Sequence, residues 1–171
     1  MTLAVILTLL LAQATSSPSP LPSNFVNGAT RSLTLDEALK RLIPDAVNEF
    51  AGDRGAKVVS PRGETGYALT FGIAGLTDCA IVATDFPFAM CIAYRGKDAA
   101  AARSAYYALK ARLHGFAGRG VPIDEAVTAA DTATLTTASY RPNASTEVMI
   151  EMVEAERNAA VVLAIKPIGT L

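Results

Sequence analysis

The spacing of apolar residues predicts a first helix from Ser32 to Phe50. Apolar positions recur every three or four residues through this stretch, so they fall on one helical face. Thr34 is a suitable N-cap, and Glu37 three residues later completes a capping box. Pro44 lies inside the pattern and lacks a backbone N–H. We therefore expect it to kink the helix or to split it in two.

Strand patterns follow this helix, and turns rich in glycine and proline separate them. The predicted strands cover residues 57–60, 66–73, 79–83 and 88–94. The last two are apolar on both faces. We therefore expect them to lie in the middle of a sheet that is covered on each side.

A second helix is predicted from the Asp98 cap to Gly115, which stands where a C′ glycine belongs. Its centre contains two adjacent tyrosines, Tyr106 and Tyr107. Neighbouring helical residues point about 100° apart. One ring is therefore expected in the core, and the other at the surface or in an interface, where a wet hydroxyl is tolerated.

The C-terminal third is predicted to be mostly strands. Val121–Ala130 has the pattern of a short helix opened by Pro122. Strands are predicted at 132–141, 146–154 and 159–167. The middle segment also fits a helix, with its glutamates on one side, but the alternation of Val148, Ile150 and Met152 favours a strand.

These elements give the order α-β-β-β-β-α-(α)-β-β-β. Helices segregated from antiparallel strands are typical of the α+β class. We expect an antiparallel sheet of about six to seven strands packed with two to three helices.

The N-terminus indicates export. Leu3–Leu11 is an apolar run without Lys or Arg, and Ala12-Gln13-Ala14 is a small-x-small cleavage site, so residues 1–14 are predicted to be a signal peptide. The run is shorter than the roughly 20 apolar residues that span a bilayer. A retained, membrane-associated segment is the alternative. Residues 15–31 are predicted to be a Pro/Ser-rich spacer, and 32–171 a single α+β domain.

Cys79 and Cys91 are the only cysteines in the chain. If the strands around them form a hairpin with its centre at Asp85, the two cysteines lie opposite each other. Opposed residues have Cβ atoms about 4.5–5.5 Å apart, close to the distance that a disulfide needs. A structural disulfide is therefore predicted. The sequence leaves a redox pair and two free thiols open as alternatives.

Composition and charge argue against several function classes. The formal net charge is −1, and Lys and Arg are dispersed, so no nucleic-acid partner is expected. With His114 as the only histidine, no metal site, cofactor site or catalytic triad is predicted. Glu147 and Glu151 share a face in the strand interpretation, but about 13 Å separates residues four apart on a strand. We interpret them as solvated charges.

The sequence therefore favours a small exported, non-catalytic binding or interaction domain in a periplasmic or extracellular compartment. The alanine-rich composition favours a bacterial source. The expected partner is an envelope protein or a small apolar ligand held between the sheet and the helices. Two other hypotheses stay open. One is an envelope hydrolase that uses Asp and Glu groups, and the other is a secreted enzyme inhibitor or immunity-type protein.

Overall fold

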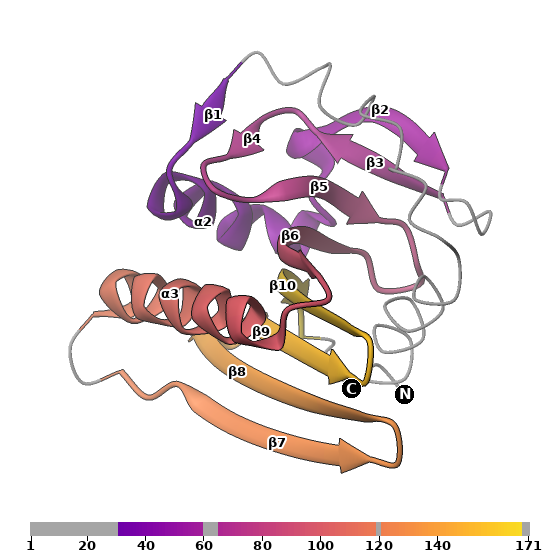
Figure 1. Cartoon of the computed structure of the whole chain (residues 1–171). Helices are drawn as coiled ribbons and strands as arrows, with labels where there is room; N and C mark the ends of the chain where they lie inside the picture. Colours follow the sequence, from indigo (N-terminus) through magenta and orange to yellow (C-terminus); the bar gives the residue numbers. More distant parts are fainter. Residues whose placement is uncertain (1–30, 60–64, 119–120, 169–171) are drawn as a thin grey trace.

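The structure is a computed structural model of the chain, and it describes residues 31–59, 65–118 and 121–168. The predicted signal peptide and all of the predicted spacer except Arg31 lie outside these residues. The α+β prediction is confirmed, because two α-helices pack with a large antiparallel sheet (Figure 1). The sheet has eight strands, somewhat more than expected.

The two α-helices are α2 (Leu35–Asp45) and α3 (Ala99–Ala117). Two short 3₁₀ helices follow α2, namely η2 (Ala46–Asn48) and η3 (Ala51–Asp53). The large sheet contains β2 (Arg54–Val59), β3 (Thr65–Leu69), β5 (Thr77–Val82), β6 (Phe88–Gly96), β7 (Asp124–Ala130), β8 (Ala133–Asn143), β9 (Thr146–Ala155) and β10 (Asn158–Pro167). A small parallel sheet pairs β1 (Ser32–Leu33) with β4 (Gly72–Ile73).

The first helix forms as its capping signal predicts. The Thr34 hydroxyl accepts a hydrogen bond from the Glu37 N–H, and the Glu37 carboxylate accepts one from the Thr34 N–H. The predicted start at Ser32 is wrong, because Ser32 pairs with β4 as part of β1. Pro44 stands in the last turn of α2, and the chain continues as the 3₁₀ helix η2. The proline therefore lies at the end of the α-helix and does not divide it.

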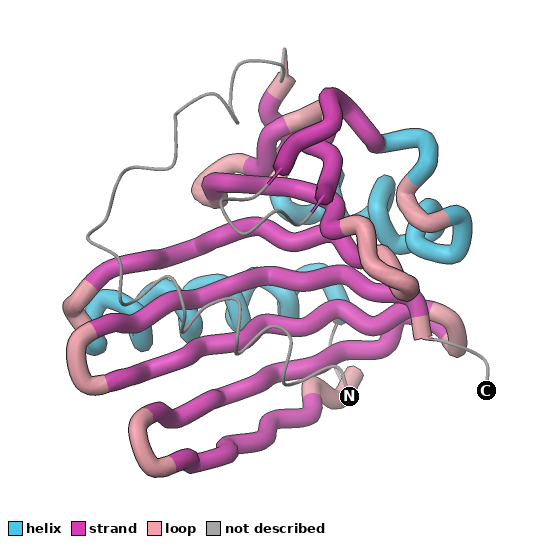
Figure 2. The backbone as a smooth tube through the Cα atoms, turned by 90° about the vertical axis from the view of Figure 1, so that its right-hand side faces the viewer, coloured by secondary structure: helices cyan, strands magenta, loops and turns pink. Residues whose placement is uncertain are grey.

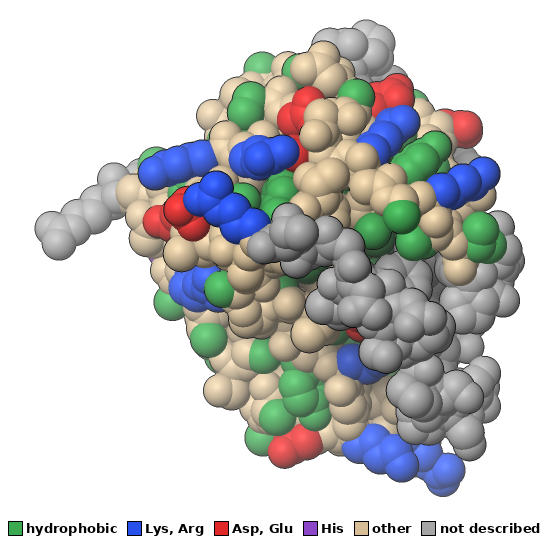
Figure 3. Space-filling model, turned by 90° about the horizontal axis from the view of Figure 1, so that it is seen from above, with side chains coloured by type: hydrophobic (Ala, Val, Ile, Leu, Met, Phe, Trp, Pro, Cys, Tyr) green, Lys and Arg blue, Asp and Glu red, His purple; other side chains and the backbone are tan. Residues whose placement is uncertain are grey.

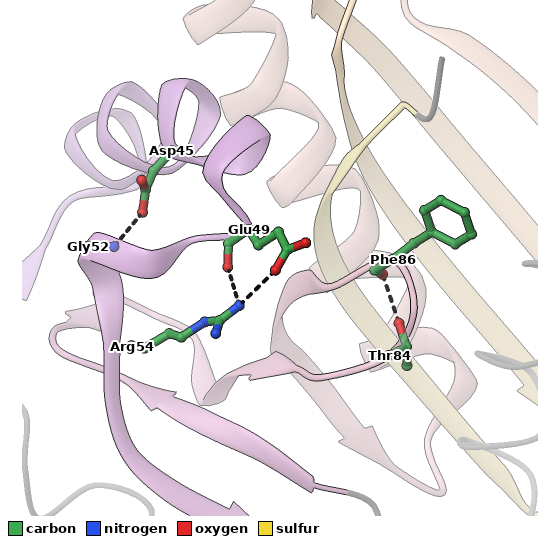
Figure 4. A network of polar contacts seen from close by, with 6 residues as sticks. All are labelled: Asp45, Glu49, Gly52, Arg54, Thr84 and Phe86. Carbon is green, nitrogen blue, oxygen red and sulfur yellow. Dashed lines mark hydrogen bonds and ion pairs between the residues drawn. The ribbon is translucent and has the colours of Figure 1, made fainter. Parts of the chain in front are cut away.

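A polar network holds the turn between α2 and β2 (Figure 4). Glu49 and Phe50 adopt left-handed backbone conformations, which turn the chain sharply. The Asp45 carboxylate accepts a hydrogen bond from the Gly52 N–H at 3.2 Å. The Arg54 guanidinium donates to the Glu49 carbonyl at 3.0 Å and pairs with the Glu49 carboxylate at 3.4 Å.

The large sheet is built from two similar halves. Its strand order is β2-β3-β5-β6-β10-β9-β8-β7, and each neighbouring pair is antiparallel. In each half a helix precedes four consecutive strands of the sheet, and the last strands of the two halves, β6 and β10, pair at the centre. This arrangement leaves β2 at one edge of the sheet and β7 at the other.

Helix α3 lies across one face of the sheet (Figure 2). Its buried side chains join those of α2 and of the inward positions of β9 and β10 in one core. Ala102, Leu109 and Leu113 of this helix are all buried there. The helix does not end at Gly115 as predicted but runs to Ala117, with Gly118 at its C-cap. No helix among the described residues is both long and apolar enough to cross a membrane.

The largest error of the sequence prediction concerns Val121–Ala130. This segment was expected to contain a helix, but Asp124–Ala130 is strand β7. All seven of its residues pair in unbroken register with β8, from Asp124 opposite Ser139 to Ala130 opposite Ala133. Pairing with a neighbouring strand therefore outweighs the local helical propensity of an Ala-rich segment.

The cysteine prediction is confirmed. A disulfide joins Cys79 to Cys91 across the β5–β6 hairpin. Beside it, Ile81 pairs with Ala89 and Val82 with Phe88, which is the register centred on Asp85. The register shifts between Thr77 and Ala80, where Asp78 adopts a left-handed conformation. Asp78 is therefore part of a strand irregularity.

Candidate functional site

Strand β7 forms an exposed edge of the sheet (Figure 1). Each of its seven residues is exposed, and within the described residues it pairs with β8 alone. A strand at the edge of a sheet presents unpaired N–H and C=O groups, which can take up another strand. The edge lacks several of the usual protective features, because β7 contains no lysine or proline and its pairing with β8 is free of bulges. Its two charged residues, Asp124 and Glu125, stand at its first two positions.

The opposite edge is protected. Strand β2 has a register irregularity between Arg54 and Lys57, and Lys57 itself is exposed. Bulges and lysines are the devices by which natural sheets avoid pairing at their edges. The two edges of the same sheet therefore differ, and β7 is the edge that is open to a partner.

Polar bonds fix β7 to helix α3. The buried Tyr106 hydroxyl donates a hydrogen bond to the Glu125 carboxylate at 2.8 Å, and Lys110 Nζ bonds the other carboxylate oxygen at 2.6 Å. These two bonds lower the pKa of Glu125, with the Lys110 bond contributing most. Burial and the Glu125 bond raise the pKa of Tyr106. These two bonds therefore fix the position of the edge strand relative to α3.

Two exposed apolar side chains lie beside this edge. Val127 is 66% exposed on β7, and Tyr107 is 60% exposed on α3. Arg103 pairs with Glu154 of β9, and Lys110 with Glu125 of β7, so the flank of α3 that contains Tyr107 faces the β9-β8-β7 part of the sheet. We call β7 and Tyr107 together the edge surface.

The expectation for the tyrosine pair is confirmed, since Tyr106 is fully buried and Tyr107 is not. The other large hydrophobic side chains exposed among the described residues are dispersed, and they are Val47, Val59 and Phe86. Phe86 lies at the tip of the β5–β6 hairpin, where its carbonyl accepts a hydrogen bond from the Thr84 hydroxyl at 2.8 Å (Figure 4). A single exposed side chain of this kind needs no functional explanation.

Glu151 is the described carboxyl group with the largest pKa shift. It lies on β9 opposite Val162 on one side and Thr137 on the other, and it is 1% exposed. Its Oε2 has no hydrogen-bond partner among the residues that the structure describes. Burial raises the pKa of Glu151 to about 7, although Lys166 acts in the opposite direction. The interpretation of this residue as a solvated charge is wrong.

Glu147, the other candidate carboxylate, forms ion pairs with two basic side chains. Lys166 Nζ lies 2.9 Å from one of its oxygens, and Arg141 Nε lies 3.7 Å from the other. The segment is a strand, as favoured, so Glu147 and Glu151 are four residues apart along β9 and their Cα atoms about 13 Å apart. Glycosidase carboxyl groups lie about 5–9.5 Å apart, so this pair does not have that geometry unless the side chains lean together.

The space between α3 and the sheet is packed with side chains. Tyr106, Leu109 and Leu113 of the helix meet Ile150 and Leu163 of the sheet in the main core, and all five are buried. This packing favours an ordinary hydrophobic core over a ligand held between sheet and helices.

No group of three or more potential metal-binding side chains occurs among the residues that the structure describes. His114 lies in the last turn of α3, as expected. The face of the molecule seen in Figure 3 carries Lys and Arg side chains at separate places, with acidic and hydrophobic side chains between them.

Comparison with known proteins gives no family assignment: no protein-family model, no curated protein and no solved structure matches the chain.

Proposed function

We propose that this protein is an exported, non-catalytic interaction domain that binds a protein partner by strand addition at β7. The observation that carries the proposal is the seven-residue edge strand, in which every residue is exposed, no lysine, proline or bulge occurs, and Glu125 is anchored to α3. In strand addition, main-chain hydrogen bonds supply affinity and side chains beside the edge supply specificity. Tyr107 is suited to the second role, because tyrosine is enriched among the anchor residues of interfaces, and Val127 adds exposed apolar surface beside it.

Export is part of this proposal. The Cys79–Cys91 disulfide fits an oxidising compartment, in agreement with the predicted signal peptide. The intact mass of the natively produced protein tests it. We expect loss of residues 1–14 and a deficit of about 2 Da for one disulfide. A full-length mass with two free thiols would overturn this part of the proposal.

The non-catalytic part is supported by the state of the acidic groups. Glu147 is paired with Lys166 and Arg141, and Glu151 is buried four residues away along β9, a Cα separation of about 13 Å. A screen with envelope polysaccharides and peptides tests the hydrolase alternative. Reproducible turnover that is lost in Glu151→Gln would replace the interaction proposal with that alternative.

Strand addition is tested with a photo-crosslinking residue placed at Ala129 of β7 in the producing cells. A control places the same residue at Lys57 on the protected edge. We expect adducts from position 129 only, and we expect Val127→Lys to abolish them, because a lysine on an edge strand opposes pairing. Val59→Lys is the matched control, since Val59 is 59% exposed and lies on the other edge strand.

The crosslinked adducts also distinguish strand addition from the inhibitor and small-ligand alternatives. A protein adduct at position 129 supports strand addition, and an enzyme bound one-to-one would specify the inhibitor alternative. If positions 129 and 57 give equal or no adducts while the native mass shows a bound small molecule, the strand-addition proposal is wrong.

A further inference from the structure

We infer that the strand taken up by β7 is the β7 strand of a second copy of this chain, so that two sheets join edge to edge about a twofold axis at Val127. This inference rests on the proposed use of β7 for strand addition and names the partner. Its basis is the sequence of β7 and the position of its charges.

The strand is complementary to itself when it runs antiparallel. Asp124–Ala130 has seven residues, so its midpoint is Val127. Pairing two copies about this midpoint uses all seven residues of each strand. It places Asp124 opposite Ala130 and Glu125 opposite Ala129, so each acidic side chain faces an alanine.

Other registers are less favourable. Moving the axis toward the N-terminus shortens the paired segment, and centring it on Glu125 sets two glutamates directly opposite each other. Like charges in opposed positions destabilise a pair of strands. Centring on Val127 avoids this, and the Glu125 charge is already compensated by Lys110 within its own copy.

The same register covers exposed apolar surface. A twofold axis perpendicular to the sheet keeps both Val127 side chains on the α3 face, where they become directly opposed neighbours. Each is 66% exposed in the single chain, and opposed aliphatic side chains in a sheet contact each other. Both Tyr107 rings then lie on the α3 face of the joined sheet, one on each side of the axis.

The geometry permits a direct test with a single cysteine. Directly opposed residues of antiparallel strands have Cα atoms about 4.5–5.5 Å apart, within the range that a disulfide accepts. The native cysteines are already bonded to each other, so the only free thiol of Val127→Cys is the new one. We expect Val127→Cys to form a covalent dimer under mild oxidation.

Ala129→Cys is the matched control, because it is exposed on the same strand and the same face. In the proposed register the two copies of residue 129 are offset by four residues, about 14 Å. It should therefore form little covalent dimer. Equal crosslinking of the two variants would overturn the register, and no crosslinking in either would overturn the dimer.

Sedimentation of the exported protein provides the second measurement. We expect twice the mass of one chain. Val127→Lys should raise the dimer dissociation constant about tenfold or more, because two like charges then meet at the axis. Val59→Lys should leave it unchanged. Circular dichroism and melting verify that both variants fold.

The outcome also separates this inference from the proposed function. A monomer in sedimentation, together with position-129 adducts that contain only another protein, would overturn self-pairing and leave strand addition standing. A monomer without any β7 adduct would overturn both.

Discussion

The Tyr106 hydroxyl donates a hydrogen bond to Glu125 across the interface between α3 and the edge strand β7, over 2.8 Å. The tyrosine is buried, and Lys110 of the same helix holds the other oxygen of the carboxylate. The position of the strand proposed to bind a partner is therefore set by two residues of the adjacent helix.

Removing this hydroxyl should loosen the edge strand. Tyr106→Phe keeps the ring in the core but deletes one hydrogen bond to a charged acceptor, which contributes about 1.5–3 kcal/mol. We expect a comparable fall in the free energy of unfolding, measured by urea denaturation. The rate of amide hydrogen exchange should rise in β7 and stay unchanged in β10. Tyr107→Phe, altered at an exposed ring, should have little effect on either measurement.

Glu151 should make the protein less stable as the pH rises. Its pKa is about 7 in the folded protein and near 4.5 in the unfolded chain, so the folded state binds more protons between these values. Its contribution to stability is fully present below about pH 4.5 and is lost as the pH rises through about 7, by at most about 1.4 kcal/mol per pH unit.

Glu151→Gln should therefore be more stable than the native protein at pH 8, by urea denaturation, and should lose this part of the pH dependence. Glu147→Gln is the control. It should be less stable than the native protein at pH 8, because it removes the ion pairs of Glu147 with Lys166 and Arg141. A Glu151→Gln variant that is less stable at pH 8 would show that the carboxylate is ionised and bound in the folded protein.

The hairpin disulfide should contribute substantially to stability. Cys79 and Cys91 are 12 positions apart, and closing a loop of this length stabilises by very roughly 3 kcal/mol. Cys79→Ser should lower the melting temperature, and so should reduction of the native protein. Unchanged melting, together with unchanged migration on a non-reducing gel, would contradict this.

The capping box should stabilise the first helix. Thr34→Ala removes the hydroxyl that accepts the Glu37 N–H, and loss of such a cap costs about 1 kcal/mol. Thermal or urea unfolding measures the change. Thr34→Ser retains the hydroxyl and should be close to the native protein.

The features predicted correctly depend on residues near one another in the sequence. Thr34 and Glu37 are three positions apart, and the cysteine register follows from symmetry about a short turn. The adjacent tyrosines likewise diverge by helix geometry alone. Such relationships can be derived from spacing without knowledge of the whole fold.

The errors concern features that distant strands determine. Asp124–Ala130 is Ala-rich and follows a proline, so its local pattern favours a helix. It forms a strand because it pairs with β8 along its whole length. Glu151 is buried on a strand that lies between β8 and β10, with apolar neighbours such as Val162, and its own local pattern does not reveal this position. The edge surface itself depends on the strand order, which no local pattern contains.

The pairing of β6 with β10 has a consequence for folding kinetics. Each half of the sheet can form its strands one after another through short connections, whereas the paired residues Ala89 and Ile165 are 76 positions apart in the chain. Contacts between residues so distant in sequence require a large loop to close, and they slow folding. Joining the two halves at the centre of the sheet should therefore be a slow, late step of folding.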